Sequence, residues 1–403
     1  MTTKQKITFA QARALFPHTK KITYFGAASI GPMSIWVRDA IADYFEARTD
    51  RAMDDTKLFF SNADELRSEY AKLIGANSDE IGIGISASFG MNIPAFGLPL
   101  KSGDEVLLSD VEFPAAVYTW RGAAEARGLK LKFIPSVNRE FSIDELERAI
   151  TPRSKVLCLS WVQYFNGFKN DLRAINTICK KHGIWFIVDG TQGMGAEYVN
   201  VKKADVDMFV SSCQKWMLSP QGGGFFYIRK ELQNIITPPS MSWQSADWHQ
   251  EFTDLFRYEL PYFDSARRFE CGYYVVSNVV GMRQSNRLFL GLGTLHIEKH
   301  NHALIDRLIR YLKVNPFYRI TSSLIPAHRS SIFAFACDNP MELHRALLKR
   351  KIIQVVREGS IRVSPHLYNN ERDIDTLIEA LDEYSRAGAN TKQAVKRGSA
   401  KKR

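Results

Sequence analysis

Short apolar runs alternate with helical patterns along the first three quarters of the 403-residue chain, and this alternation restricts the folds it can adopt. Runs rich in Val, Ile, Leu and Phe are typical of strands buried on both faces. Helical patterns separate several of them, as in 115–128 and 172–183. Such alternation predicts an α/β fold class with a mostly parallel sheet covered on both faces. The predicted strands are 104–110, 130–136, 154–162, 184–190, 207–212 and 223–229.

The pattern changes near residue 240. Residues 240–290 are rich in aromatic side chains and show no regular period, so we predict irregular structure there. From about residue 290 a long helical pattern leads into alternating strands and helices that end with 371–387. The expected organisation is an N-terminal segment 1–23 that packs with the small domain, a large domain 24–289, a small α+β domain 290–389 and a basic tail 390–403.

The formal net charge of +11 raises the question of nucleic-acid binding. Residues 390–403 carry six Lys and Arg and no acid, which leaves only +5 for the rest of the chain. We expect this tail to be a disordered, solvated end rather than a polyanion-binding arm, so nucleic acid is not an expected partner. No apolar run is long enough to span a bilayer, so no membrane is expected either.

The beginning of the chain, MTTKQKITFAQARALF, lacks the apolar stretch of a signal peptide. The five cysteines are scattered, odd in number and in no CxxC pair, a pattern typical of reduced thiols. Both features predict a cytoplasmic protein. The histidines His296, His300 and His302 fall in a helical pattern beside charged residues, which favours an exposed face over a metal site, and no metal is expected.

A lysine and an acid follow two successive predicted strands. Lys215 lies in VSSCQKWMLSPQGGGFFYI (210–228), among apolar neighbours and before a glycine-rich turn. Lysine is costly to bury, so a lysine there is either an exception or a nucleophile with a lowered pKa. Asp189 ends the preceding strand in IVDGTQGMGA (187–196), and the two strand ends should face one cavity. A lysine able to form a Schiff base and an acid able to hold a ring nitrogen protonated suit pyridoxal phosphate.

Two further motifs could bind anionic groups. GISASFGMNIPA (84–95) predicts a strand, a small-residue turn and a helix, which could present backbone N–H groups to a phosphate or be an ordinary turn. Arg362 lies within an apolar strand pattern in IRVSPHLYNNERDID (361–375). An arginine there needs a partner, either a carboxylate ligand or a structural salt bridge.

In their order and spacing, several segments resemble the class V aminotransferase family of fold-type I pyridoxal-phosphate enzymes, which includes cysteine desulfurases and isopenicillin N epimerase-like proteins. These segments are YFGAASIGPMS (24–34), EFPAAVYTW (112–120), VDGTQ (188–192), SSCQKW (211–216), RRFECGYY (267–274) and the stretch around Arg362. The resemblance covers nearly the whole chain. It implies the fold-type I transferase fold, a pyridoxal 5′-phosphate cofactor, a small amino-acid substrate and a homodimer with shared active sites.

The resemblance also implies a role for each matching position. Lys215 would carry the cofactor and act in catalysis together with Asp189, the acid on the pyridine nitrogen. Arg362 would bind the substrate carboxylate, and Ala27 and Ala28 would line the substrate pocket. The other residues expected around the cofactor are Ala87, Ser88, Ser212 and Gln214 at its phosphate, Phe113 on its ring, Gln192 and Tyr164 near its phenolate oxygen, and Tyr273 reaching across from a partner subunit.

Three hypotheses for function remain open. The segment QVVREGSIRVS (354–364) contains no cysteine, so the nucleophile expected of a desulfurase is missing there. We expect transamination of an α-amino acid first, and a lyase or an epimerase of the same fold second. A binding or regulatory protein that keeps the fold without turnover is the third hypothesis, and the set of Lys215, Asp189 and Arg362 argues against it.

Overall fold

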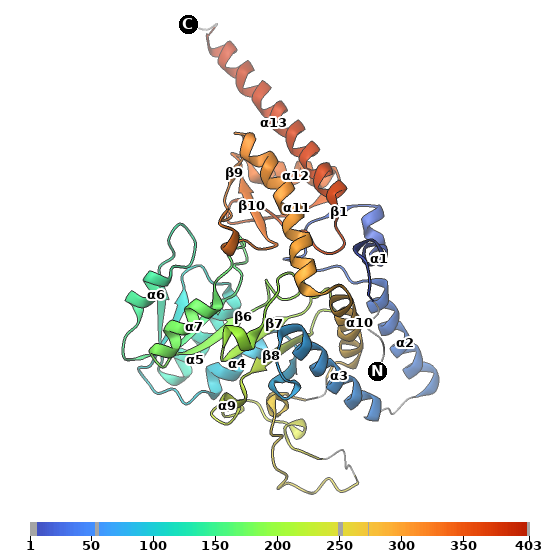
Figure 1. The fold of residues 1–403 in the computed structure, drawn as a ribbon, viewed down its shortest axis with the longest axis vertical. Helices are drawn as coiled ribbons and strands as arrows, with labels where there is room; N and C mark the ends of the chain where they lie inside the picture. The colour runs from blue at the N-terminus through green and yellow to red at the C-terminus, as the bar shows by residue number, and fades with distance from the viewer. Residues whose placement is uncertain (1–5, 53–55, 249–252, 273, 401–403) are drawn as a thin grey trace.

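The computed structural model describes residues 6–52, 56–248, 253–272 and 274–400 (Figure 1). A seven-stranded sheet in the order β2-β8-β7-β6-β5-β3-β4 forms the centre of its larger part. All six strands predicted from the sequence are present in this sheet. The strands are β2 (Ile81–Gly84), β3 (Glu105–Ser109), β4 (Lys130–Ile134), β5 (Ser154–Ser160), β6 (Trp185–Asp189), β7 (Met208–Ser212) and β8 (Gly224–Ile228).

The sheet is mostly parallel, as predicted. Strands β3 to β7 pair in parallel, whereas β8 runs antiparallel to both β7 and β2. The connection between β7 and β8 contains no helix, and a parallel neighbour would need a longer crossover. Lys215 lies in this short connection, three residues after β7, and therefore stays beside the carboxyl ends of the parallel strands.

Helices cover both faces of the sheet, which is why its strands are apolar throughout. Adjacent residues of β8 show this clearly, because Phe225 packs in the core on one face and Phe226 in the core on the other. The first core includes residues of α3 (Thr56–Ile74), α6 (Ile143–Ala149), α7 (Leu172–Lys181), α8 (Val201–Ala204) and α10 (Val276–Leu292), and the second those of α4 (Ala87–Gly97), α5 (Pro114–Arg127) and α9 (Lys230–Gln233).

A smaller part with a core of its own lies at the other end of the molecule (Figure 1). Its antiparallel sheet has the order β12-β13-β10-β9. A two-residue parallel pair, β1 (Thr23–Tyr24) with β11 (Ile352–Ile353), joins the N-terminal segment to this part. The remaining elements are α1 (Phe9–Ala14), α2 (Ile35–Arg51), α11 (Thr294–Val314), β9 (Arg319–Ile320), β10 (Phe333–Ala336), α12 (Pro340–Lys349), β12 (Val355–Arg357), β13 (Ser360–Val363) and α13 (Glu371–Ala400).

The structure differs from the sequence predictions in two places. Helix α10 begins at Val276, inside the stretch predicted to be irregular. Its buried face includes Ser285 and Asn286, and these polar residues hide the apolar period from a sequence reading. Helix α13 continues to Ala400, through most of the tail predicted to be disordered, in a segment rich in the helix formers Ala, Lys, Gln and Arg. Among the described residues, no helix is long and apolar enough to cross a membrane.

Candidate active site

The carboxyl ends of β6 and β7 open into a cavity of about 250 Å³. Asp189 is the last residue of β6 and pairs in register with Val210 of β7. Lys215 follows β7 by three residues in a tight turn, where the Leu218 N–H donates to the Lys215 carbonyl oxygen and Leu218 has a left-handed φ of 53°. The cavity is lined by Ser86, Ala87, Ser88, Phe113, Ala115, Ser160, Val162, Tyr164, Asp189, Thr191, Gln192, Ser212, Gln214 and Lys215.

This lining brings together nine of the residues that the sequence placed at a cofactor. They come from five stretches of the chain: the start of α4, the residue before α5, the loop after β5, and the ends of β6 and of β7 with the turns that follow them. Tyr273, the tenth, lies outside the described residues. Ser86, Thr191 and Ser160 also line the cavity, although the sequence reading gave them no role. Thr191 belongs to the VDGTQ motif (188–192), so its sequence position could have predicted a place in this cavity.

Lys215 is partly buried in the cavity wall. Burial lowers the pKa of the Lys215 amine to about 8, an effect that nearby Asp189 opposes and the cations Arg362 and Arg357 reinforce. Its Nζ atom lies 5.0 Å from the centre of the Phe113 ring. Near neutral pH a larger fraction of this amine is therefore neutral, and so nucleophilic, than in an ordinary lysine.

Asp189 is held by the turn that follows its strand. The Thr191 N–H donates to Asp189 Oδ1 at 2.9 Å, and within the described part of the chain no hydrogen bond is formed to Oδ2. The carboxylate is 6% exposed and lines the cavity. One oxygen thus fixes the side chain, and the other is available to a cationic N–H group inside the cavity.

Small hydroxyl residues surround the N-terminus of α4. Ser86 caps this helix by accepting from the Phe89 N–H, and Ser212 Oγ accepts from the Ala87 N–H at 2.7 Å. Thr191 Oγ1 in turn accepts from the Ser212 N–H. A helix N-terminus ringed by hydroxyl groups is suited to a phosphate monoester.

Gln192 connects the cavity to the N-terminal loop. Its Nε2 donates to the Ala28 carbonyl at 3.1 Å, and its Oε1 accepts from the indole N–H of Trp216 at 2.9 Å. Ala27 and Ala28 are buried and lie beside the cavity rather than in its lining. Gln192 is therefore oriented by two neighbours before any ligand binds.

Gly31 is a further residue that the sequence reading missed. Its N–H donates to the Gln214 carbonyl, and a Cβ at this position would lie 2.0 Å from the carbonyl oxygen of Lys215. A side chain at position 31 would therefore displace the backbone that carries Lys215. The N-terminal loop and the lysine turn fit together only because this residue is glycine.

Arg362 is buried without an acidic partner. The side chain is 1% exposed, its Nη2 donates to Ser29 Oγ at 2.6 Å, and its Nη1 donates to the Tyr164 carbonyl. Among the described residues no carboxylate pairs with it, and its Nε is buried without a hydrogen-bond partner. Burial and the nearby Arg357 lower the pKa of Arg362 to about 9. The salt-bridge alternative from the sequence therefore has no support among the described residues. Arg362 is not among the residues that line the cavity around Lys215, and its Nε–H is the donor left without a partner.

Glu112, a buried acid behind the cavity, was not assigned a role from the sequence. It accepts hydrogen bonds from the Ser160 N–H, the Ser160 hydroxyl and Gln163 Nε2. Burial raises the pKa of Glu112 to about 7, and the charge of Asp189 contributes in the same direction. Glu112 therefore fixes the end of β5, next to the acid that lines the cavity.

None of the five cysteines lines this cavity. Cys213, the nearest in sequence to Lys215, is buried against the Tyr70 hydroxyl at 3.1 Å, and burial raises its thiol pKa to about 12. Its thiol therefore does not face the cavity. Cys271 is exposed, and all five cysteines are free of disulfide bonds.

The histidines of α11 have separate partners. His300 stacks on Phe9, whereas His302 contacts the buried carboxylate of Glu197. Glu197 and Glu298 lie close enough to His302 to be considered as metal ligands. The ammonium group of Lys169 binds both carboxylates, at 2.8 and 3.1 Å, and already supplies a cation to this cluster.

The cavity fits pyridoxal 5′-phosphate by the chemistry of its groups. The amine of Lys215 suits the aldehyde, the free oxygen of Asp189 suits the pyridinium N–H, and the hydroxyl-ringed start of α4 suits the phosphate. Phe113 offers an apolar surface beside the lysine. Fold and cavity together define a fold-type I pyridoxal-phosphate enzyme.

The chain belongs to the aminotransferase class-V family, whose family model matches residues 36–377. Its cofactor is pyridoxal 5′-phosphate, as the sequence predicted. It is 26% identical to the "uncharacterized aminotransferase YcbU" of Bacillus subtilis, over 92% of this chain and 96% of that protein. It is 25% identical to a "probable cysteine desulfurase" of Pyrococcus abyssi, over 91% and 95% of the two chains. The apo cysteine desulfurase of Thermococcus onnurineus has a similar structure, with a TM-score of 0.83, 23% identity and coverage of 96% and 100%.

Proposed function

We propose that this enzyme binds a small α-amino acid through its carboxylate and cleaves a β-substituent from it, with a carbon–sulfur bond as the preferred target. The observation that carries the proposal is Arg362, a buried guanidinium with no carboxylate partner among the described residues, close enough to Lys215 to lower its pKa. Burying an unpaired charge costs free energy, so a ligand that pairs with Arg362 best explains why this charge is buried. The α-carboxylate of an amino acid matches its planar fork.

In this proposal each side chain has a separate task. When bound, pyridoxal phosphate supplies an electron sink for negative charge at the substrate Cα. Arg362 orients the substrate by its carboxylate, and Ser29 and the Tyr164 carbonyl keep the guanidinium in place. Lys215 Nζ, with its lowered pKa, takes the Cα proton as general base and can return it as general acid. Asp189 would hold the pyridine nitrogen of the bound cofactor in its protonated form.

The absence of a thiol from the cavity lining supports elimination rather than persulfide formation. Desulfuration through a protein persulfide needs a thiolate that reaches the substrate sulfur. Elimination needs only the proton transfer at Cα and departure of the sulfur, after which water completes the conversion of cysteine to pyruvate, ammonia and hydrogen sulfide. The naming of the Pyrococcus relative as a probable cysteine desulfurase supports carbon–sulfur cleavage.

Transamination is the second candidate, and Arg357 is the observation that favours it. This exposed residue lies close enough to lower the pKa of both Lys215 and Arg362, and no salt bridge to it is found among the described residues. A second cation near the cavity would suit the distal carboxylate of a dicarboxylic amino acid such as glutamate. The naming of the Bacillus relative as an aminotransferase agrees with this alternative.

Product analysis separates the two candidates. The holoenzyme is incubated with cysteine alone, and pyruvate, ammonia and sulfide are measured; glutamate with a keto acid is tested in parallel. Elimination predicts equal amounts of the three products without added keto acid, and the same yields after Cys271→Ser. Turnover that strictly requires a keto acid and releases no ammonia would favour transamination. Sulfide release that disappears in Cys271→Ser would instead identify a persulfide mechanism.

We further propose a homodimer. Residues 253–262 lie in a segment that projects from the large domain (Figure 1), where Phe256 is 84% exposed and Tyr258 is 82% exposed. Exposed aromatic side chains of this size are typical of protein interfaces, and Leu255 and Tyr262 extend the patch. Sedimentation equilibrium should give twice the chain mass for the wild type and a weakened dimer for Phe256→Ser/Tyr258→Ser. A monomeric wild type at micromolar concentration would refute the dimer.

A further inference from the structure

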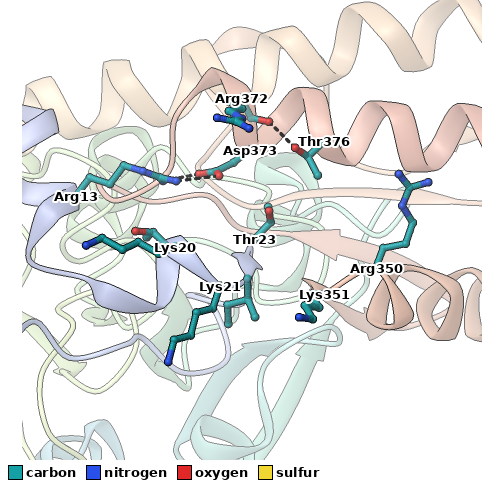
Figure 2. Close-up of a pocket in the computed structure, with 11 residues that line it drawn as sticks. Arg13, Lys20, Lys21, Thr23, Arg350, Lys351, Arg372, Asp373 and Thr376 are labelled. Atoms are coloured by element: carbon teal, nitrogen blue, oxygen red, sulfur yellow. Dashed lines mark hydrogen bonds and ion pairs between the residues drawn. The ribbon is translucent and has the colours of Figure 1, made fainter.

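A second cavity, of about 390 Å³, lies at the joint between the N-terminal segment and the small domain. It shares no lining residue with the cavity around Lys215. Figure 2 shows that basic side chains surround it from three parts of the chain: α1 with the turn before β1, the end of α12, and the start of α13. Its lining residues are Arg13, Thr19, Lys20, Lys21, Ile22, Thr23, Arg350, Lys351, Arg372, Asp373 and Thr376.

The residues that line this cavity carry more positive charge than the acidic side chains paired with them neutralise. Asp373 is its one acidic lining residue, and it is already bound to Arg13 in a bidentate pair at 2.6 and 3.1 Å. Arg350 is paired with Glu383 outside the cavity. The side chains of the other four cations have neither an ion pair nor a hydrogen bond among the described residues; they are Lys20, Lys21, Lys351 and Arg372.

These four cations are exposed at the rim of the cavity, on both sides of a joint held by few backbone hydrogen bonds. The Thr23 N–H donates to the Lys351 carbonyl at 3.0 Å, and the Phe25 N–H donates to the Ile353 carbonyl at 2.8 Å. Lys20 and Lys21 belong to one side of this joint, and Lys351 and Arg372 to the other. Like charges on the two sides of this joint repel, so without an anion they oppose the contact that the backbone makes.

We propose that this cavity binds a small multivalent phosphate anion, of the diphosphate class found free or in nucleoside diphosphates. Its volume is within the range of small-molecule sites. Four unpaired cations match a diphosphate group better than a single phosphate or a monocarboxylate. Arginine and lysine together supply a planar fork and mobile point charges for phosphoryl oxygens. The bound anion bridges the N-terminal segment and the small domain and so stabilises their contact.

The test is a calorimetric titration of the holoenzyme with pyrophosphate at constant ionic strength. The holoenzyme is used because its cofactor already fills the phosphate site near α4. We expect saturable binding to the wild type and a higher thermal midpoint with pyrophosphate. In Lys20→Gln/Lys351→Gln the affinity should fall about tenfold or more, because two positive charges that would pair with the phosphate oxygens are removed. Gln is chosen because Lys351 has a φ of 60°, which disfavours bulkier or branched replacements.

A matched control removes two exposed lysines that line neither cavity, Lys101→Gln/Lys130→Gln, with the same change in net charge. This control should bind pyrophosphate within twofold of the wild type. Without ligand, Lys20→Gln/Lys351→Gln should be at least as stable as the wild type, because repulsion has been removed. The proposal is wrong if the wild type shows no saturable binding, if both double variants lose affinity equally, or if citrate at equal charge binds as tightly as pyrophosphate.

Discussion

Replacing Lys215 with alanine is expected to abolish covalent attachment of the cofactor and to lower turnover about a thousandfold or more. Among the described residues that line the cavity it alone carries an amine, and its pKa of about 8 suits it both to bind the aldehyde and to move a proton. Borohydride reduction followed by peptide mass analysis should fix the cofactor on Lys215 in the wild type and nowhere in the variant. Lys215→Arg should also be inactive, because its guanidinium does not lose its proton.

Lys299→Ala provides the control, since this exposed lysine of α11 does not line the cavity. It should keep the cofactor and full activity. A small primary amine added to Lys215→Ala should restore part of the proton transfer, which a purely structural lysine would not permit. Wild-type levels of covalent attachment in Lys215→Ala would assign the cofactor to another lysine and remove the basis of the proposed function.

The same residue gives an expected pH dependence. The neutral amine is the nucleophile, so the rate at which apoenzyme captures pyridoxal phosphate should rise with pH and level off above about 8, not near the ordinary lysine value of 10.5. Arg362 lowers this pKa, so Arg362→Met should move the midpoint upward; Asp189 raises it, so Asp189→Asn should move it downward. Comparing variants by stopped-flow absorbance cancels the titration of the cofactor itself. Identical midpoints would show that these charges do not act on Lys215.

The strands of the large sheet could be predicted because burial on both faces makes them continuous apolar runs. The antiparallel placement of β8 could not, since it depends on the lack of a crossover helix after Lys215 rather than on the composition of β8 itself. Helix α10 was missed because its buried face includes polar Ser285, whose hydroxyl is satisfied by the Met217 carbonyl. That partner lies 68 residues away in sequence, and no local pattern shows it.

The residues of the candidate site also fall into those that the sequence reveals and those that only the structure reveals. Lys215 and Asp189 could be found because chemically distinctive residues at the ends of successive strands must meet at one edge of a sheet. Gly31 could not be found, because its constraint arises only where its backbone approaches the Lys215 carbonyl. Glu112 looked like an ordinary residue before a helix, and its burial depends on Ser160 and Gln163 from a distant strand end. Residues that hold others in place are therefore visible mainly in three dimensions.

Arg362→Met is expected to lower kcat/KM for α-amino acids by about 30-fold to 4,000-fold, since truncating a hydrogen-bonded charge pair in a buried site costs about 2–5 kcal/mol. Cofactor content should remain normal, because the contacts of Arg362 are with Ser29 and Tyr164. Methionine keeps most of the side-chain volume without the charge. The amino-acid dissociation constant is measured from the absorbance change of the bound cofactor. Arg362→Lys should recover little, because a point charge cannot replace the planar fork.

A second arginine shows whether the role of Arg362 is substrate binding or folding. Arg67 is also buried, but it forms a bidentate pair with the fully buried Glu270 at 2.6 and 2.9 Å. Arg67→Met should therefore destabilise the fold by about 3–5 kcal/mol, because it leaves Glu270 charged and unpaired. Arg362→Met removes a charge that has no acidic partner among the described residues, so its thermal midpoint should be unchanged or higher. If Arg362→Met destabilises the protein as much as Arg67→Met while amino acids still bind normally, Arg362 is a structural residue and the substrate carboxylate is bound elsewhere.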